Sequence, residues 1–369
     1  MRYFYTIWIS AIIVTLISGF STGAIIRDSK SIAHRDARTT SAIVSSNTKK
    51  SPTVSQKLNQ SSWSVDSILA LSGNLFASPK TSYDPRRAII DTATGHMDVR
   101  MYDVTYNRAK LPIVQLAEAW VKMRWILEDK KYSNFGNSYV GTKALFSDVG
   151  IKIVSDSDLG LGTNYVHAKT FVTDQRAIIQ TANLTKWGFT TSREYYVQLT
   201  DQAIIDNLQD LFDADRAGKP LSAEKIHSNL LVCPINCRAI VQSLIKWATT
   251  SIWIHNQYLE DPGLARLLQT KTNLDLQMIL AKNDFSSGSL SKFGNRISIV
   301  TSPYPHAKMM LIDDTYLMVS SINFSTNSMD NNREIGVIVT DRESIDYFKE
   351  RFLQDRAKGK NLPQNQKKK

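Results

Sequence analysis

The chain has 369 residues, of which 42% are hydrophobic, and it carries a formal net charge of +11. This is enough apolar material for two ordinary domains or one large two-lobed unit, which excludes a wholly disordered chain. The positive charge favours a polyanionic partner, either nucleic acid or the anionic surface of a membrane, without choosing between them.

The first element along the chain is an uncharged, largely apolar segment from Tyr3 to Ile26, directly after Arg2. A segment of about 20 apolar residues is long enough to cross a bilayer, and a secretory signal has the same general pattern. We therefore assign residues 1–26 to a signal or a single membrane anchor. The protein is then membrane-associated, or secreted if the segment is cleaved. Basic residues that follow favour a cytoplasmic C-terminal side, but large domains are often translocated despite such charges, so the topology stays open.

Residues 27–62 are rich in serine and threonine and show no apolar periodicity, which is typical of a flexible polar linker. At the other end, residues 357–369 include the run KGKNLPQNQKKK and are assigned to a basic tail. The folded part is therefore expected between residues 63 and 356.

Two stretches of this part repeat the same order of elements. The spacing of apolar residues in the first stretch predicts strands at 97–105, 123–129 and 150–158 and a helix at 113–123. The second stretch predicts a helix at 238–250 and strands at 251–261, 274–284 and 296–303. Strands that alternate with helices predict an α/β fold, in which a parallel or mixed sheet is covered on both faces. We divide the folded part into repeat 1, residues 63–215, and repeat 2, residues 216–356, as two pseudo-symmetric halves.

The repeat is sharpest at a set of polar residues. The pattern H-x-K-x4-D occurs twice, and each copy is followed by an asparagine and then, eleven residues later, by a glutamate. The members are His167, Lys169, Asp174, Asn183 and Glu194 in the first copy, and His306, Lys308, Asp313, Asn323 and Glu334 in the second. A histidine that only fills a core has no need of these partners, so the matched sets predict that the halves share one functional site.

Two imidazoles, two ammonium groups and two carboxamides around one cavity suit a phosphodiester. The lysines and the asparagine amides can hold the non-bridging oxygens while phosphorus is five-coordinate. A neutral imidazole can attack phosphorus, and a protonated one can donate its proton to the departing alkoxide. A glutamate hydrogen-bonded to the other ring nitrogen fixes the tautomer of each imidazole. We expect no metal and no other cofactor, because the lysines supply positive charge, and a monomer suffices because one chain carries both sets.

The paired motifs resemble those of the phospholipase D superfamily over roughly residues 63–356. The resemblance implies two α-β-α sandwich halves that share one active site, a phosphohistidine intermediate, and a water or alcohol that resolves it. It assigns His167, Lys169, Asn183 and Glu194 to one half-site and His306, Lys308, Asn323 and Glu334 to the other. It also makes Thr185 and Ser325, two residues after each asparagine, candidate phosphate-binding hydroxyls. The sequence departs from the family pattern where QTAN and SSIN replace the usual glycine-serine start of the motif's turn.

Other polar and aromatic residues have structural interpretations. Asp174 and Asp313 fall in the turn after a strand, where a carboxylate accepts backbone N–H bonds. We expect His96 and His255 to be structural or surface histidines, and Tyr258 and Trp187 to be core aromatics. Cys233 and Cys237 are the only cysteines, and they form either a local disulfide or two free thiols.

These observations leave several functions open. We rank first a phospholipid phosphodiesterase of phospholipase D type that acts by hydrolysis or by phosphatidyl transfer at an anionic membrane surface. A cardiolipin-synthase-like phosphatidyltransferase ranks second, because such enzymes usually have two membrane segments and only one is visible. A nuclease that cleaves nucleic-acid phosphodiesters is the alternative outside lipid chemistry. The resemblance favours His167 as the nucleophile, although the two motifs themselves are indistinguishable.

Overall fold

The computed structural model describes residues 63–79, 93, 95–129, 137–282 and 290–361. The expected signal or anchor at residues 1–26 and the expected linker lie outside these residues. Within the described part of the chain, no helix is both long and apolar enough to cross a membrane.

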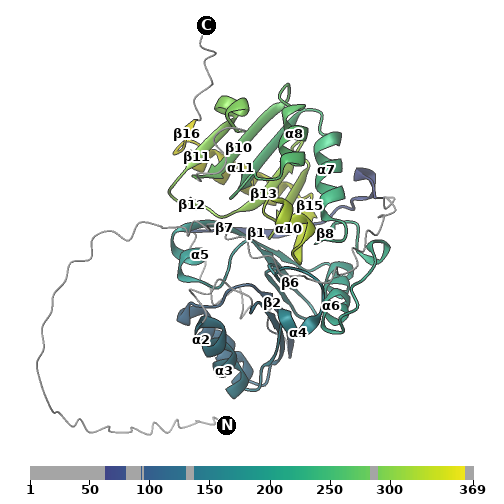
Figure 1. Cartoon of the computed structure of the whole chain (residues 1–369), viewed down its shortest axis with the longest axis vertical. Coiled ribbons are helices and arrows are strands. Elements are labelled where there is room, and N and C mark those ends of the chain that lie inside the picture. Colours follow the sequence, from purple (N-terminus) through teal and green to yellow (C-terminus); the bar gives the residue numbers. More distant parts are fainter. Residues whose placement is uncertain (1–62, 80–92, 94, 130–136, 283–289, 362–369) are drawn as a thin grey trace, which may run out of the picture. The chain divides into compact units, whose positions relative to one another are not determined.

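Strands of the described residues form two eight-stranded sheets, one in each half (Figure 1). Sheet 1 has the order β1 (Asn74–Ser78), β7 (Ser192–Leu199), β6 (Ala177–Gln180), β5 (Thr170–Val172), β2 (His96–Met101), β3 (Lys122–Leu127) and β4 (Lys152–Ser155), and β12 (Tyr304–Pro305) pairs with β7. Sheet 2 has the order β16 (Lys360–Asn361), β11 (Ile297–Val300), β10 (Asp275–Ala281), β9 (Ser251–Asn256), β13 (Lys308–Ile312), β14 (Tyr316–Ser320), β15 (Glu334–Val339) and β8 (Leu230–Cys233).

Each sheet combines a parallel part with an antiparallel part. Strands β2, β3 and β4 are parallel, as are β9, β10 and β11, and helices connect them. Two hairpins, β5–β6 and β13–β14, lie beside these parallel parts and carry the ends of the two motifs. This arrangement confirms the predicted α/β fold with two pseudo-symmetric halves.

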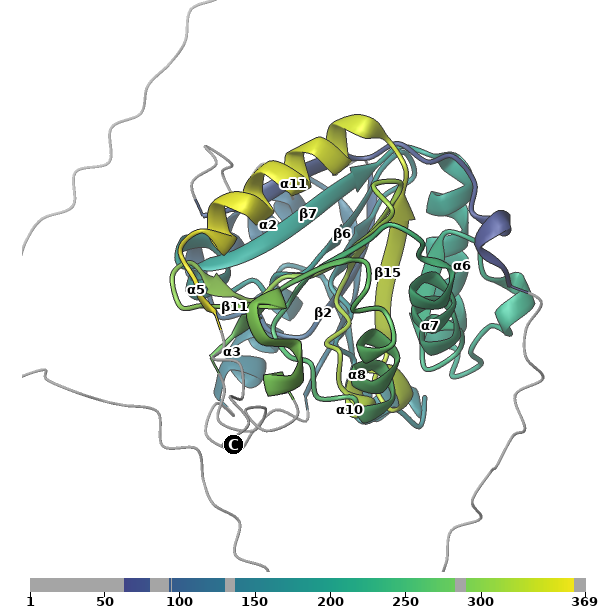
Figure 2. The same cartoon turned by 90° about the horizontal axis from the view of Figure 1, so that it is seen from above.

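Helices cover the outer faces of the sheets and also border the junction between them (Figure 2). The helices α2 (Asn107–Glu118) and α3 (Asn137–Asp148) cover sheet 1, whereas α7 (Cys237–Trp247), α8 (Pro262–Gln269) and the 3₁₀ helix η4 (Ser291–Arg296) cover sheet 2. Apolar residues of both inner faces form one core with α6 (Gln202–Arg216) and α11 (Arg342–Arg356). Short helices connect the rest: η1 (Val65–Ser67), α4 (Asp156–Leu159), α5 (Lys186–Thr190), η3 (Ala223–Lys225) and α10 (Thr326–Asp330).

The two halves are interlocked rather than merely adjacent. Helix α11 of the second half contacts β1 of sheet 1 as well as β10 and β11 of sheet 2 (Figure 2). Strand β12, which belongs to the second half by sequence, pairs with β7 of the first. Within the segment expected to be a basic tail, Lys360 and Asn361 form β16 at the edge of sheet 2.

The two cysteines form a disulfide at the start of α7, with their Cα atoms 5.1 Å apart. Both residues are fully buried. Of the two alternatives left open by the sequence, the structure therefore shows the local bridge. The bond lies next to β15, because Cys233 pairs with Glu334 in the β8–β15 ladder.

The two motif aspartates occupy equivalent hairpin turns but differ in their contacts. Asp313, at a φ of 48°, accepts hydrogen bonds from the backbone N–H groups of Thr249, Thr250 and Ser251. It also accepts from the hydroxyls of both threonines. Asp174 is 65% exposed and contacts the side chain of Gln209 at 3.4 Å. Only the second-half aspartate ties its turn to a neighbouring loop.

We expect Asp313→Asn to lower the free energy of unfolding by roughly 1–2 kcal/mol at pH 7, because the uncharged amide is a weaker acceptor for these N–H groups. Although burial opposes ionisation, the N–H bonds bring the pKa of Asp313 down to about 2. The carboxylate therefore stabilises the fold above the unfolded pKa of about 3.9, and this contribution disappears as the pH falls toward 2. Chemical denaturation of both proteins from pH 7 to pH 3 should show the difference narrowing below about pH 4.

The matched control is Asp174→Asn in the first half, which we expect to stay within about 0.5 kcal/mol of the unmodified protein. An equal loss of stability in the two variants would contradict the assignment of the turn contacts.

Candidate active site

The two histidine motifs are held against strands of the opposite half. Backbone N–H groups of His167 and Ala168 both donate to the carbonyl of Arg333 at 2.9 Å. On the other side, the N–H of His306 donates to the carbonyl of Arg193 at 3.3 Å. Each motif therefore pairs with the residue directly before the glutamate of the other half.

The two motif histidines lie just outside the strands that follow them. Residues 167–169 lie immediately before β5, and His306 lies between β12 and β13. Lys308 is the first residue of β13. The two motifs thus enter their strands at the junction between the halves, where the opposite half supplies their backbone partners.

Each imidazole is hydrogen-bonded through Nδ1 to the glutamate of the opposite half. The distance from His167 Nδ1 to Glu334 Oε2 is 2.8 Å, and that from His306 Nδ1 to Glu194 Oε1 is 2.6 Å. The resemblance assigns Glu194 to the half-site of His167 and Glu334 to that of His306, and each glutamate binds the ring of the other half-site. Neither half forms a complete histidine–glutamate pair by itself.

The glutamates are themselves held by hydroxyl groups that sequence reasoning missed. Thr181 Oγ1 donates to Glu194 Oε2 at 2.5 Å, and Ser321 Oγ donates to Glu334 Oε2 at 2.5 Å. Both hydroxyl residues lie two positions before the motif asparagine, in the runs QTAN and SSIN. This shared position was the available signal, but the difference between threonine and serine obscured it.

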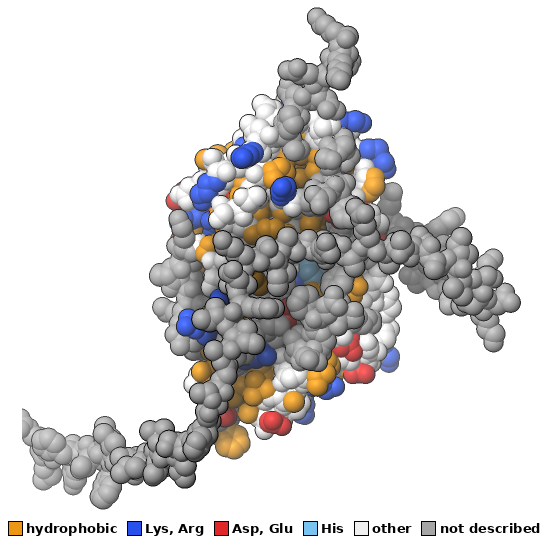
Figure 3. Space-filling model, turned by 60° about the vertical axis from the view of Figure 1, so that its left-hand side comes forward, with side chains coloured by type: hydrophobic (Ala, Val, Ile, Leu, Met, Phe, Trp, Pro, Cys, Tyr) orange, Lys and Arg blue, Asp and Glu red, His pale blue; other side chains and the backbone are white. Residues whose placement is uncertain are grey.

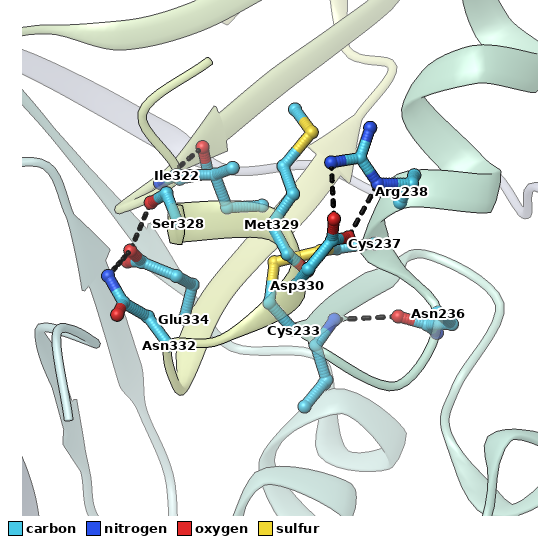
Figure 4. The surroundings of a disulfide bond; sticks show 12 residues. Cys233, Asn236, Cys237, Arg238, Ile322, Ser328, Met329, Asp330, Asn332 and Glu334 are labelled. Carbon is cyan, nitrogen blue, oxygen red and sulfur yellow. Dashed lines mark hydrogen bonds and ion pairs between the residues drawn. A yellow bond between two sulfur atoms is a disulfide. The ribbon is translucent and has the colours of Figure 1, made fainter. Parts of the chain in front are cut away.

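Glu334 has two further partners. Ser328 Oγ donates to its Oε1, and the side-chain amide of Asn332 donates to the same oxygen at 3.2 Å. Figure 4 shows Ser328 and Asn332 directed at Glu334, close to the disulfide of Cys233. Burial alone would raise the pKa of Glu334. The charge and the hydrogen bond of His167 lower it, as do the charge of Lys169 and the hydrogen bond from Ser321, so the pKa lies below its usual value.

The two motif lysines are fully buried. Each donates from Nζ to the backbone carbonyl of its own motif histidine at 2.6 Å. Burial lowers the pKa of Lys308 to about 8, against the opposing charges of Glu194 and Glu334. Lys308 is therefore a cation at neutral pH but loses its charge about two pH units earlier than a free lysine.

Both imidazoles are neutral at pH 7 in the unliganded site. Burial lowers the pKa of His167 to about 4, with Glu334 opposing and Lys169 and Lys308 contributing. Burial likewise lowers the pKa of His306, with Glu194 opposing. The charges of the same two lysines act on both rings, so the half-sites lie within electrostatic reach of each other.

The imidazoles remain accessible from outside. Side chains of His167 and His306 are 12% and 17% exposed, and Figure 3 shows a histidine side chain near the middle of one face, at the level of the junction. Since Nδ1 is bound to a glutamate in each case, Nε2 is the ring nitrogen available to a ligand. Among the residues that the structure describes, neither Nε2 has a hydrogen-bond partner.

The asparagines and hydroxyl residues after the motifs occupy equivalent turns. The buried Oδ1 atoms of Asn183 and Asn323 have no hydrogen-bond partner within the described ranges, which is unusual for polar atoms that serve only the fold. The hydroxyls of Thr185 and Ser325 cap α5 and α10, where each oxygen accepts a backbone N–H at 3.2 Å. Their hydroxyl protons can still donate to a phosphate.

The histidines and aromatic residues outside the motifs differ in their surroundings. His255 is buried in β9, and neither ring nitrogen has a partner among the described residues. His96 contacts the buried carboxylate of Asp98 at 3.1 Å. Trp187 is 71% exposed, so the expectation of a core aromatic is wrong there.

A group of carboxylates lies close to the first motif. Oxygens of Glu128, Asp129 and Asp156 lie within 4.8 Å of one another, which is the spacing that a metal ion needs. One oxygen of Glu128 accepts the backbone N–H of Val166 at 2.7 Å. Glu128 therefore supports the segment that leads into His167.

The fold and the crossed half-sites are those of a protein of phospholipase D type. The sequence profile of the family described as "Cardiolipin synthase, PLD-like domain" matches residues 87–216 and 241–356. The chain belongs to this family of phospholipase D-like phosphodiesterases and phosphatidyltransferases. Among curated protein sequences, none matches the chain.

Solved structures share the fold at low sequence identity. A polyphosphate kinase from Porphyromonas gingivalis superimposes with a TM-score of 0.62 at 16% identity, over 79% of this chain and 49% of that one. This chain thus spans about half the length of the kinase. A phosphatidylserine synthase from Haemophilus influenzae Rd KW20 superimposes with a TM-score of 0.58 at 12% identity, over 80% of this chain and 90% of that one.

We expect kcat/KM for a phosphodiester to fall above about pH 8, because Lys308 loses its positive charge there and no longer attracts the phosphate. The charge is present below this pKa and absent above it. In Lys308→Arg the cation persists at high pH, so the remaining activity should show no fall near pH 8. The same alkaline fall in both proteins would contradict the assignment.

We expect Ser321→Ala to lower kcat about ten-fold, because Glu334 loses a charge-assisted hydrogen bond and holds the His167 ring less firmly. The matched control is Ser298→Ala in β11. It removes an equally buried hydroxyl, which donates to the carbonyl of Arg356. Steady-state kinetics of the two variants provide the measurement. A similar loss of kcat in both would show that the effect is not specific to the site.

Proposed function

We propose that this protein is a phosphatidyltransferase of the cardiolipin-synthase type, which moves a phosphatidyl group between alcohols through a phosphohistidine intermediate. The observation that carries the proposal is the pair of crossed histidine–glutamate contacts with both lysines acting on both rings. A site with two imidazoles fixed in one tautomer suits a two-step displacement, in which one ring bonds phosphorus and the other handles the proton.

The first step begins with a neutral imidazole. His167 Nε2 attacks phosphorus and forms an N–P bond, while the bond to the leaving alkoxide breaks. Protonated His306 donates its Nε2 proton to that alkoxide, so the first alcohol leaves neutral. Lys169 and Lys308 balance the negative charge that shifts onto the non-bridging oxygens.

The second step reverses the proton transfer. Neutral His306 accepts the proton of the incoming alcohol, whose oxygen attacks phosphorus as the N–P bond to His167 breaks. The product is a new phosphodiester, and His306 is again protonated. Water in place of the alcohol gives hydrolysis by the same steps, so the balance between transfer and hydrolysis depends on which acceptor reaches the site.

Two findings support transfer over hydrolysis as the main activity. The matching family is described as a cardiolipin synthase domain, and the similar fold from Haemophilus influenzae is a phosphatidylserine synthase. The sequence alone had ranked a general phospholipid phosphodiesterase first. The proposed donor and acceptor are therefore phospholipids, with phosphatidylglycerol as the first pair to test.

We also propose that the catalytic domain acts at a membrane surface that faces an oxidising compartment. The apolar segment from Tyr3 to Ile26 supports attachment, and the net charge of +11 supports contact with anionic lipid. The disulfide of Cys233 and Cys237 supports an oxidising compartment, because such bonds rarely persist in a reducing one.

We expect the full-length protein to convert phosphatidylglycerol in vesicles to cardiolipin and free glycerol, as measured by mass spectrometry of the lipids. Phosphatidic acid as the main product would indicate hydrolysis instead. Cleavage of single-stranded DNA without any change in the lipids would overturn the lipid assignment in favour of a nuclease.

His167→Asn and His306→Asn should each lower the rate at least roughly a thousand-fold, because asparagine can neither attack phosphorus nor transfer the proton. The control is His96→Asn, whose ring is 28% exposed and bonds Asp98 outside the site. We expect that variant to keep its activity within about two-fold. Activity that survives both motif substitutions would exclude the proposed mechanism.

A further inference from the structure

A second set of crossed contacts lies directly beside the histidine–glutamate pairs. Arginine precedes each glutamate, at Arg193 and Arg333, and an aspartate follows 22 residues later in each half, at Asp215 and Asp355. These aspartates lie in the last turns of α6 and α11. The structure joins each arginine to the aspartate of the opposite half.

Arg193 makes a bidentate contact with Asp355. Nε and Nη2 of the guanidinium lie 2.5 and 3.1 Å from the two carboxylate oxygens. Nη1 donates to the carbonyl of Ser78 at 2.7 Å, at the end of β1. Both charged side chains are almost fully buried, with exposed fractions of 3% and 1%.

Arg333 forms a single ion pair with Asp215 rather than a bidentate contact. Its Nη2 lies 3.0 Å from Oδ1 of the carboxylate, and its Nη1 donates to the carbonyl of Cys233 at 2.9 Å. Asp215 also pairs with Arg100 of β2 at 3.3 Å. The strand position that corresponds to Arg100 in the second half holds His255, so the two sets are similar but not identical.

Each arginine–glutamate dipeptide therefore makes three contacts with the opposite half. The arginine carbonyl accepts the backbone N–H of the motif histidine, the glutamate holds the ring of that histidine, and the guanidinium binds the aspartate. Burying two charges costs desolvation energy, and well-packed apolar residues are often at least as stabilising. The bidentate pair of Arg193 and Asp355 adds a fixed direction, because arginine then binds the carboxylate in a defined plane. The single ion pair of Arg333 and Asp215 ties the guanidinium to the opposite half at one point.

We propose that Asp215 and Asp355 are positioning residues, which set the orientation of His167 through Arg333 and of His306 through Arg193. The proposal rests on the proposed function for its catalytic consequence. The pairing of each aspartate with one histidine does not depend on the substrate, and it can be tested without turnover.

The test that does not depend on turnover uses the full-length protein labelled with ¹⁵N-histidine. Six histidines give six pairs of imidazole nitrogen signals, and His167→Asn and His306→Asn identify the two pairs that belong to the motif histidines. We expect Asp355→Asn to shift the His306 signal and to leave that of His167 in place, whereas Asp215→Asn should do the reverse. His255 will also move in Asp355→Asn, because Asp355 acts on it directly.

Asp98→Asn is the matched control. Asp98 is as buried as the other two aspartates and pairs with Arg124 at 2.6 Å, but it does not touch either arginine–glutamate dipeptide. It should shift His96, its direct neighbour, and neither motif histidine. Equal shifts of both motif histidines in Asp215→Asn and Asp355→Asn, or shifts in neither, would overturn the proposal.

Kinetics with bis(4-nitrophenyl) phosphate supply the second readout. We expect Asp355→Asn to lower kcat at least roughly ten-fold with KM within about three-fold, because a misaligned ring affects the transition state more than binding. The double variant Asp355→Asn with Glu194→Gln should be no slower than Glu194→Gln alone, since both act through His306. If the fold-losses of kcat in the two single variants multiply in the double variant, the effect is general destabilisation and the proposal is overturned.

If Asp355→Asn fails to fold, Arg193→Lys provides the same test. It keeps the buried positive charge but loses the bidentate contact. Absence of turnover in the unmodified protein would argue against the proposed function, whereas the histidine signals would still decide the positioning role.

Discussion

The constraint on which the rest of the structure depends is that each buried glutamate finds its imidazole only in the opposite half. A carboxylate removed from water needs hydrogen-bond donors around it, and leaving it unpaired costs several kcal/mol. Glu194 and Glu334 meet this need across the junction, with His306 and His167. The site therefore exists only when both sheets are assembled, and the shared core with α6 and α11 is what holds them in register.

The charges of the assembled site explain how buried histidines can serve in acid–base chemistry. Two lysines and two glutamates sum to no net charge while both imidazoles are neutral. A phosphodiester adds one negative charge, which one proton on an imidazole then balances. A nearby negative charge raises the pKa of an imidazole, so the ligand itself creates the protonated state that the leaving alcohol requires. The lysines, which add to the effect of burial in keeping both imidazoles unprotonated in the free site, become partners of the phosphate.

Much of this site could be predicted from the sequence, because the same polar residues recur at matching spacing in the two copies of the motif. The matched spacing identified His167, His306 and their partners without any fold. Spacing within one copy cannot reveal contacts between copies, so the crossing of the glutamates was missed. Thr181 and Ser321 were overlooked because a hydroxyl that supports a glutamate has no pattern of its own. The difference between Asp174 and Asp313 depends on a loop at residues 249–251, which only the fold brings to the turn.

The copies also differ in a way that separates the roles of the two histidines. Glu334 accepts hydrogen bonds from Ser321, Ser328 and Asn332 in addition to the His167 ring. At the position equivalent to Ser328, the first half has Gly188, which has no hydroxyl to offer Glu194. A carboxylate with more donors is a weaker base and stabilises a neighbouring imidazolium less. This difference supports the proposed roles, in which the His167 ring stays neutral as the nucleophile and His306 takes the proton supplied to the leaving group.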